Sequence, residues 1–166
     1  MKRLLFDTSV YGELVKDLRV VDALAERIPK DFVVYGTRLI RRELRAISRK
    51  VKIGKESKRK LLLSVYDFFV RKDNHNLKET DIIETIAQRY YAAYKKFGGA
   101  LSYDALANDF NIVACASVHR LDVVVSHDTA SMLSGNAMRA YESVNKNYQL
   151  QLPEFIPYVK FKERLI

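Results

Sequence analysis

Residues 3–9 read Arg3-Leu4-Leu5-Phe6-Asp7-Thr8-Ser9, a short apolar run that ends abruptly in three polar residues. An apolar run of this length is typical of a buried β-strand. Hydroxyl residues often occupy the N-cap of a helix, so Thr8 or Ser9 is expected to begin one. The stretch therefore predicts a strand that leads directly into a helix, with Asp7 at the junction.

The same alternation of apolar strands and amphipathic helices continues along the chain. Further strands are predicted at 32–35, with Gly36 as the end of that strand, at 123–125 and at 155–161, and one more either at 74–79 or after Gly99. Helices are predicted over 10–28 with a break near 16–17, over 38–50 with Thr37 as cap, and over 56–72, 80–96, 104–119 and parts of 129–146. Strands that are apolar throughout and alternate with helices favour a parallel sheet covered on both faces, which is an α/β fold.

Length and composition limit the class of protein. The chain has 166 residues, of which 48% are hydrophobic, enough for one domain with a core, so 1–166 are taken as a single domain. No apolar run approaches the roughly 20 residues that cross a bilayer. Asp7 follows the N-terminus too soon for a signal peptide, and the single cysteine, Cys115, is expected in the core. A cytoplasmic location without a membrane anchor is expected.

Positive charge is concentrated in one segment. The formal net charge is +9, and residues 38–60 alone contain eleven lysines and arginines. Four of them are spaced as one stripe on the predicted helix 38–50: Arg38, Arg42, Arg45 and Arg49. We interpret the stripe as a surface that follows nucleic-acid phosphates, although a solvated face or a protein-binding surface fits the pattern equally well.

Two acids follow predicted strands. Asp7 ends the first strand, and Asp128 comes shortly after the strand at 123–125. In parallel sheets, ligands bind beyond the carboxyl ends of the strands, so both positions suit a functional site. Helix capping by Asp7 and a turn at Asp128 are the structural alternatives.

Two further acids lie on the inward sides of helices. Glu43 is three residues after Ile40, and Asp109 is three residues after Leu106, so each shares an apolar side. A carboxylate that points inward needs a partner or a cation. The alternatives are an internal salt bridge from Glu43 to an arginine and backbone hydrogen bonds to Asp109.

Together the four acids predict a metal site. Carboxylates that converge repel one another by roughly 4 kcal/mol per pair at about 4 Å, unless protons or cations neutralise them. Hard divalent ions such as Mg²⁺ or Mn²⁺ suit an all-oxygen site and can activate water against a phosphodiester.

Four motifs carry a resemblance to a known family. They are Leu5-Phe6-Asp7-Thr8-Ser9, Arg42-Glu43-Leu44, Asn108-Asp109-Phe110-Asn111-Ile112-Val113-Ala114-Cys115-Ala116 and Val124-Val125-Ser126-His127-Asp128. In this order and spacing the chain resembles the PIN-domain nucleases, including VapC-type toxins.

The resemblance implies a three-layer α/β/α sandwich around a parallel sheet. It also implies that Asp7, Glu43, Asp109 and Asp128 bind Mg²⁺ or Mn²⁺ and cleave RNA, with Thr8 and Ser126 as accessory residues. A homodimer and an antitoxin partner are further expectations from the family.

Asp104 could compete with Asp109, but five residues turn a helix by ~140°, so we assign Asp104 to the first turn of its helix. The three tyrosines Tyr90, Tyr91 and Tyr94 could stack on bases, although core packing is favoured.

The main alternative to an endoribonuclease is an RNA-binding protein of the same fold without turnover. An aspartate-nucleophile phosphatase is disfavoured because Ser9, and not an acid, stands two residues after Asp7.

Overall fold

A computed structural model describes residues 1–71 and 74–166 of the chain. In these residues, one sheet has five strands in the order β5-β2-β1-β6-β7, and every neighbouring pair is parallel. The strands are β1 (Lys2–Phe6), β2 (Phe32–Thr37), β5 (Asn76–Leu77), β6 (Val123–Ser126) and β7 (Glu154–Pro157). A parallel sheet was the prediction, and the strand expected at 74–79 or after Gly99 is β5.

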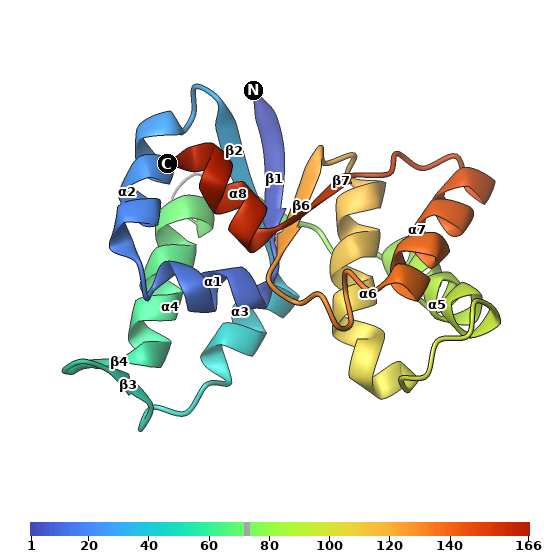
Figure 1. Cartoon of the computed structure of the whole chain (residues 1–166), viewed down its shortest axis with the longest axis horizontal. Coiled ribbons are helices and arrows are strands. Elements are labelled where there is room, and N and C mark those ends of the chain that lie inside the picture. The colour runs from blue at the N-terminus through green and yellow to red at the C-terminus, as the bar shows by residue number, and fades with distance from the viewer. Residues whose placement is uncertain (72–73) are drawn as a thin grey trace.

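Helices cover both faces of this sheet (Figure 1). One layer contains α1 (Thr8–Leu14), α2 (Leu18–Arg27), α4 (Lys58–Tyr66) and α8 (Tyr158–Leu165). The other contains α5 (Asp81–Lys96), α6 (Tyr103–Val118) and α7 (Gly135–Asn147). The predicted three-layer α/β/α sandwich is therefore confirmed, with the short helix α3 (Arg38–Arg45) near the carboxyl ends of the strands.

The centre of the sheet forms the middle of the core. Leu4, Leu5 and Phe6 of β1 are at most 1% exposed, and β6 is buried along its whole length. Helix α6 is buried continuously from Ile112 to Ser117, because it packs against both the sheet and α5. Such burial on all sides explains why these segments read as unbroken apolar runs.

The tyrosines of α5 belong to this core. Tyr90 is completely buried and its hydroxyl lies 2.5 Å from Asn145 Oδ1 and 3.1 Å from Ser117 Oγ. Tyr94 is 4% exposed and Cys115 is 1% exposed. Core packing, the favoured interpretation, is confirmed for these residues. Neither Tyr90 nor Tyr94 has an exposed ring face on which a base could stack.

Strand β2 does not end at Gly36 as predicted but continues to Thr37. A Cβ atom at Gly36 would lie 2.3 Å from the hydroxyl of Tyr66, so the absent side chain makes room for this ring. The Tyr66 hydroxyl lies within hydrogen-bond distance of Thr37 O and Asn76 Oδ1. Gly36 is thus required for packing, and Thr37 caps α3 as expected, with its Oγ1 accepting from Ile40 N at 3.2 Å.

The predicted helix 38–50 ends early, at Arg45. It is followed by a small antiparallel hairpin, β3 (Lys52–Ile53) and β4 (Glu56–Ser57), whose turn contains Gly54 at φ +62°. A positive φ favours glycine, and this signal for a turn was missed.

The predicted helix 56–72 begins only at Lys58, after the hairpin, and Asp67–Arg71 form a π-helical turn. Phe68, expected on the apolar side of this helix, lies in the π-helical turn and is 47% exposed. Residue 72 of that prediction lies outside the described residues.

Two further predictions near the C-terminus need correction. The segment 155–161 is a strand only as far as Pro157, after which α8 begins at Tyr158. Proline fits the start of a helix because it has no N–H to donate. The segment 129–146 contains one helix, α7, that starts at Gly135.

The predicted break in the helix near 16–17 is confirmed, since Asp17 caps α2. Within 1–71 and 74–166, no helix combines the length and hydrophobicity needed to cross a bilayer.

Two Gly→Ala substitutions should have opposite effects on stability. Gly36→Ala forces a methyl group against Tyr66 and should lower the free energy of unfolding by about 1–3 kcal/mol. Gly12→Ala, within α1 and with no atom within 4 Å of the new Cβ, should raise it by about 0.5–1 kcal/mol. Urea denaturation of the two variants measures both. Equal changes in the free energy of unfolding of the two variants would show that the Tyr66 ring moves aside without loss of stability.

Candidate functional site

Asp7 lies at the carboxyl end of β1 and is only 4% exposed. Its Oδ1 accepts from Val10 N at 3.2 Å and from Ser9 Oγ at 2.5 Å. Its Oδ2 accepts from Ser126 Oγ at 2.6 Å. Asp7, and not Thr8 or Ser9, is therefore the N-cap of α1, while its second oxygen faces the end of β6.

Ser126 connects the exits of two central strands. Besides donating to Asp7, its hydroxyl accepts from Asp128 N at 3.0 Å. A second link runs in parallel, because His127 N donates to Ser9 Oγ at 2.9 Å. These bonds hold Asp7 and Asp128, the first and last of the four predicted acids, at the carboxyl end of the sheet.

Asp128 has both a structural role and a position in the site. Its Oδ1 accepts from Ala130 N at 3.0 Å and from Ser131 N at 2.9 Å, as a turn aspartate does. Its Oδ2 accepts a hydrogen bond from the Ser131 hydroxyl. That hydroxyl is also 2.8 Å from Asp109 Oδ2, so it lies between two carboxylates.

Asp109 reaches this cluster from α6. Burial raises the pKa of its carboxyl to about 7, and the negative charges of Asp128, Asp7 and Glu43 add to this effect against the hydrogen bond from Ser131. Burial also raises the pKa of Asp7, against hydrogen bonds from Ser126, Ser9 and Val10. The four carboxylates therefore share one electrostatic environment.

Glu43 joins the cluster from α3, which is anchored by buried Ile40 and Leu44. Its Oε2 accepts from the Thr8 hydroxyl, and its Oε1 accepts from Asn108 Nδ2 at 2.7 Å. The partners of the inward carboxylate are thus a hydroxyl and an amide, and not the arginine that the alternative interpretation supposed.

The structure brings together the four predicted acids with Thr8 and Ser126, and it leaves Asp104 exposed in the first turn of α6. Three contributing residues were missed: Ser9, Asn108 and Ser131. Asn108 precedes Asp109 directly and Ser131 follows Asp128 by three residues, but their residue types alone gave no signal.

The donor set of the site consists of oxygen atoms from carboxylates and hydroxyls. Hard cations such as Mg²⁺ and Mn²⁺ prefer such ligands, so the residues present fit an ion of this kind. Across 1–71 and 74–166, no three His, Cys, Asp or Glu side chains are already gathered as a ligand cluster. Ser131 lies between the carboxylates of Asp109 and Asp128, whereas Ser126 holds Asp7, and Thr8 and Asn108 hold Glu43.

The basic stripe is shorter than predicted. Arg38, Arg42 and Arg45 are exposed on α3 and line one shallow cleft together with Arg41. Arg49 lies beyond the end of α3, so it leaves the stripe and lines a second cleft with Arg59 and Lys60. Arg41 forms a bidentate ion pair with Asp67, with both N–O distances 3.0 Å.

An α/β/α domain with four acids at the carboxyl end of its parallel sheet has the architecture expected of a PIN domain. The sequence matches the model of the PIN-domain family over residues 4–132, a stretch that contains all four acids. The chain therefore belongs to the PIN-domain family.

Several solved structures share the fold. FitAcB from Neisseria gonorrhoeae is 26% identical, with a TM-score of 0.54 over 81% of this chain and 92% of that one. VapBC-1 from nontypeable Haemophilus influenzae is 13% identical, with a TM-score of 0.60 over 95% and 99%. VapBC2 from Rickettsia felis, bound to a DNA fragment from its promoter, is 10% identical, with a TM-score of 0.62 over 93% and 98%. A search of curated proteins found no match.

Because the pKa of Asp109 is raised in the folded protein, ionisation of this carboxyl lowers the free energy of unfolding. The Asp109 carboxyl has a pKa of about 7 in the folded protein, well above the 3.8 that is usual for an aspartate, so the folded state binds the proton more tightly. Stability is therefore lost as the pH rises from about 4 to 7. Asp109→Asn removes this loss and should be more stable than the wild type at pH 8 by about 1–2 kcal/mol, after allowance for solvent screening.

Thermal melts from pH 4 to 8 without divalent ions measure the difference. It should shrink toward zero at pH 4, and the exposed Asp104→Asn is the matched control that should follow the wild type. An Asp109→Asn variant less stable than the wild type at pH 8 would contradict the assigned environment of this carboxyl.

Proposed function

We propose that this PIN-domain protein is a divalent-metal-dependent endoribonuclease that acts as the toxin of a toxin–antitoxin pair. The observation that carries the proposal is the position of Asp109, whose carboxyl is influenced by Asp7, Glu43 and Asp128 at once. A chain gains no stability from gathering four acids, so a ligand that requires them is the simplest explanation.

The four acids Asp7, Glu43, Asp109 and Asp128 would hold Mg²⁺ or Mn²⁺. When bound, such an ion supplies the acidity that makes water a nucleophile at neutral pH and offsets negative charge on the phosphate. Asp109 would bind such an ion as a carboxylate, because a nearby cation would lower the pKa that burial has raised.

The other residues of the site orient these acids. Ser126 and the N–H of Val10 fix the two oxygens of Asp7 on opposite sides. Asn108 fixes one oxygen of Glu43, and Thr8 the other. Acids held in this way need little rearrangement to receive a ligand, which favours catalysis through preorganisation.

Arginines of α3 would bind the RNA backbone. Arg38, Arg42 and Arg45 are exposed beside Glu43 on the same short helix. A guanidinium binds phosphate oxygens in a bidentate manner, so these side chains suit a strand that passes the acids. RNA as the substrate, in preference to DNA, comes from the family resemblance.

An antitoxin partner is proposed from the relatives. The VapBC and FitAB proteins have the same fold, and two of these structures include DNA fragments. By analogy, this chain would be bound and inhibited by a small partner protein, and it would form a homodimer.

A second candidate, RNA binding without turnover, is favoured by one observation. Hydroxyl and amide groups already hydrogen-bond to the carboxylate oxygens that a metal would need. If these bonds persist in solution, the arginine cleft would bind RNA and the acids would stay unmetallated.

Cleavage of single-stranded RNA with added Mn²⁺ or Mg²⁺ tests the two candidates. Asp7→Asn and Asp109→Asn should each lower the rate by at least about 100-fold, because each removes a charged ligand. Asp104→Asn, on the same helix but exposed, is the matched control and should cleave as the wild type does. Undiminished cleavage by both site variants would remove the assignment. RNA binding without cleavage in any divalent ion would select the second candidate.

The salt dependence of RNA binding tests the arginine cleft. In an Asp7→Asn background, the double substitution of Arg38 and Arg45 by Gln should weaken binding. It should also reduce the slope of log K against log salt by about 1.4, which is about 0.7 for each charge on a single strand. Substitution of Lys2 and Lys30 by Gln removes two charges near the amino ends of β1 and β2 and should leave the slope unchanged. An equal loss of RNA affinity and of salt slope in the two double variants would mean that only the net charge of the protein determines binding.

A further inference from the structure

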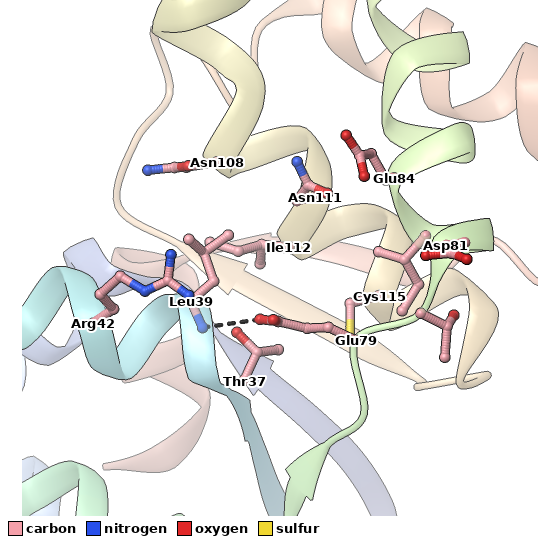
Figure 2. A pocket seen from close by; sticks show the side chains of 12 residues that line it. Thr37, Leu39, Arg42, Glu79, Asp81, Glu84, Asn108, Asn111, Ile112 and Cys115 are labelled. Carbon is pink, nitrogen blue, oxygen red and sulfur yellow. Dashed lines mark hydrogen bonds between the residues drawn. The ribbon is translucent and has the colours of Figure 1, made fainter.

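A cavity of about 300 Å³ is lined by Asn108, the residue whose side chain also hydrogen-bonds to Glu43 (Figure 2). It lies between the start of α3, the segment that leads into α5, and the side of α6 that carries Asn108, Asn111, Ile112 and Cys115. Glu79 closes one wall, because its Oε1 accepts from Leu39 N at 3.0 Å. The proposed cleavage chemistry does not use this space.

The lining combines apolar side chains with hydrogen-bonding groups. Leu39, Ile112 and Cys115 provide apolar contact, and Asn111 and Glu84 provide polar groups (Figure 2). A cavity with this mixture accepts a flat ring whose edge carries polar atoms.

The polar groups of the lining include several acceptors. Asn111 donates one Nδ2 hydrogen to Ala107 O of its own helix at 2.7 Å, which leaves its Oδ1 and its second N–H available to a ligand. Glu84 is an exposed carboxylate, and Asp81 adds a second one. A ligand that donates hydrogen bonds therefore fits this cavity better than one that only accepts them.

Asn108 connects the cavity to the acids. Its Nδ2 donates to Glu43 Oε1 at 2.7 Å, while the residue also lines the cavity. Arg42 lines the same cavity from α3 and is exposed. A nucleotide whose base entered here would thus have its phosphate between an arginine and the carboxylate cluster.

We propose that this cavity is a base-binding site for an unpaired nucleotide beside the cleaved bond, and that it prefers a base with an exocyclic amino group over uracil. Single-stranded RNA is read through splayed bases that stack on side chains and hydrogen-bond by their edges. A carboxylate accepts from the amino group of cytosine, and an amide oxygen from that of adenine. Uracil donates only through its ring N3–H and has a carbonyl oxygen where the amino group would be, and this oxygen meets the Glu84 carboxylate unfavourably. The site rests on the proposed function, because it assigns the sequence preference of the same enzyme.

Binding of CMP and UMP tests the site without any cleavage, since the two ligands differ only at one edge of the ring. Cytosine has an amino group and an unprotonated N3 there, and uracil has an oxo group and an N3–H. In NMR titrations of the full chain without divalent ions, CMP should bind about 5- to 10-fold tighter than UMP. Shifts should be largest at the amides of Leu39 and Ile112. Glu84→Gln replaces an acceptor by a group that also donates, and it should remove most of the difference. Glu26→Gln, an exposed acid on α2, is the matched control and should retain it.

Equal binding of the two nucleotides, or shifts confined to other parts of the chain, would overturn the proposal. Cleavage of a random-sequence RNA pool then separates the two inferences. The wild type should avoid uridine at one position next to the cut, and Glu84→Gln should relax this bias. Cleavage without any base bias would remove the base site and leave the nuclease. Preference for CMP in a protein that cleaves no RNA would support the base site and remove the nuclease.

Discussion

Repulsion among four carboxylates at one end of the sheet is the constraint on which the rest of the structure depends. Among the residues that the structure describes, no lysine or arginine forms an ion pair with these acids, although arginines are plentiful on α3. Each acid instead lies against neutral donors: Asp7 accepts from Ser126, Glu43 from Thr8 and Asn108, and Asp128 from Ser131 N, while the single hydroxyl proton of Ser131 lies between Asp109 and Asp128. Neutral donors stabilise the acids in place and leave their charge for a ligand to neutralise.

The core of the sheet provides the rigidity that this arrangement needs. β1 and β6 are direct neighbours, with Phe6 paired to Val125, so the residues that follow them, Asp7 and Ser126, are brought together by register. Both strands are buried on both faces, which makes a shift of register very unfavourable. Helices α3 and α6 add Glu43 and Asp109 at this end of the sheet.

The positions of strands and of inward acids could be predicted from the sequence because burial leaves a periodic pattern. Asp109 stands out in α6 because an apolar side surrounds it, and Asp7 because it ends an apolar run. Elements of two residues carry no such pattern, which is why β3 and β4 were missed and β5 could not be placed with certainty. Arg49 was misplaced for the related reason that spacing assumes a helix, and α3 ends before it. The roles of Ser131 and Asn108 depend on which segments meet in space, and no local signal encodes that.

The β3–β4 hairpin gives the molecule an arm of positive charge that extends beyond its body (Figure 1). Residues 49–60 carry seven lysines and arginines against the single acid Glu56. Because this arm extends into solvent, a polyanion that approaches this end of the molecule meets the arm before it reaches the four acids of the site. At physiological ionic strength its field reaches only about 8 Å, so the arm attracts anionic groups that pass close by and has little influence on distant ones.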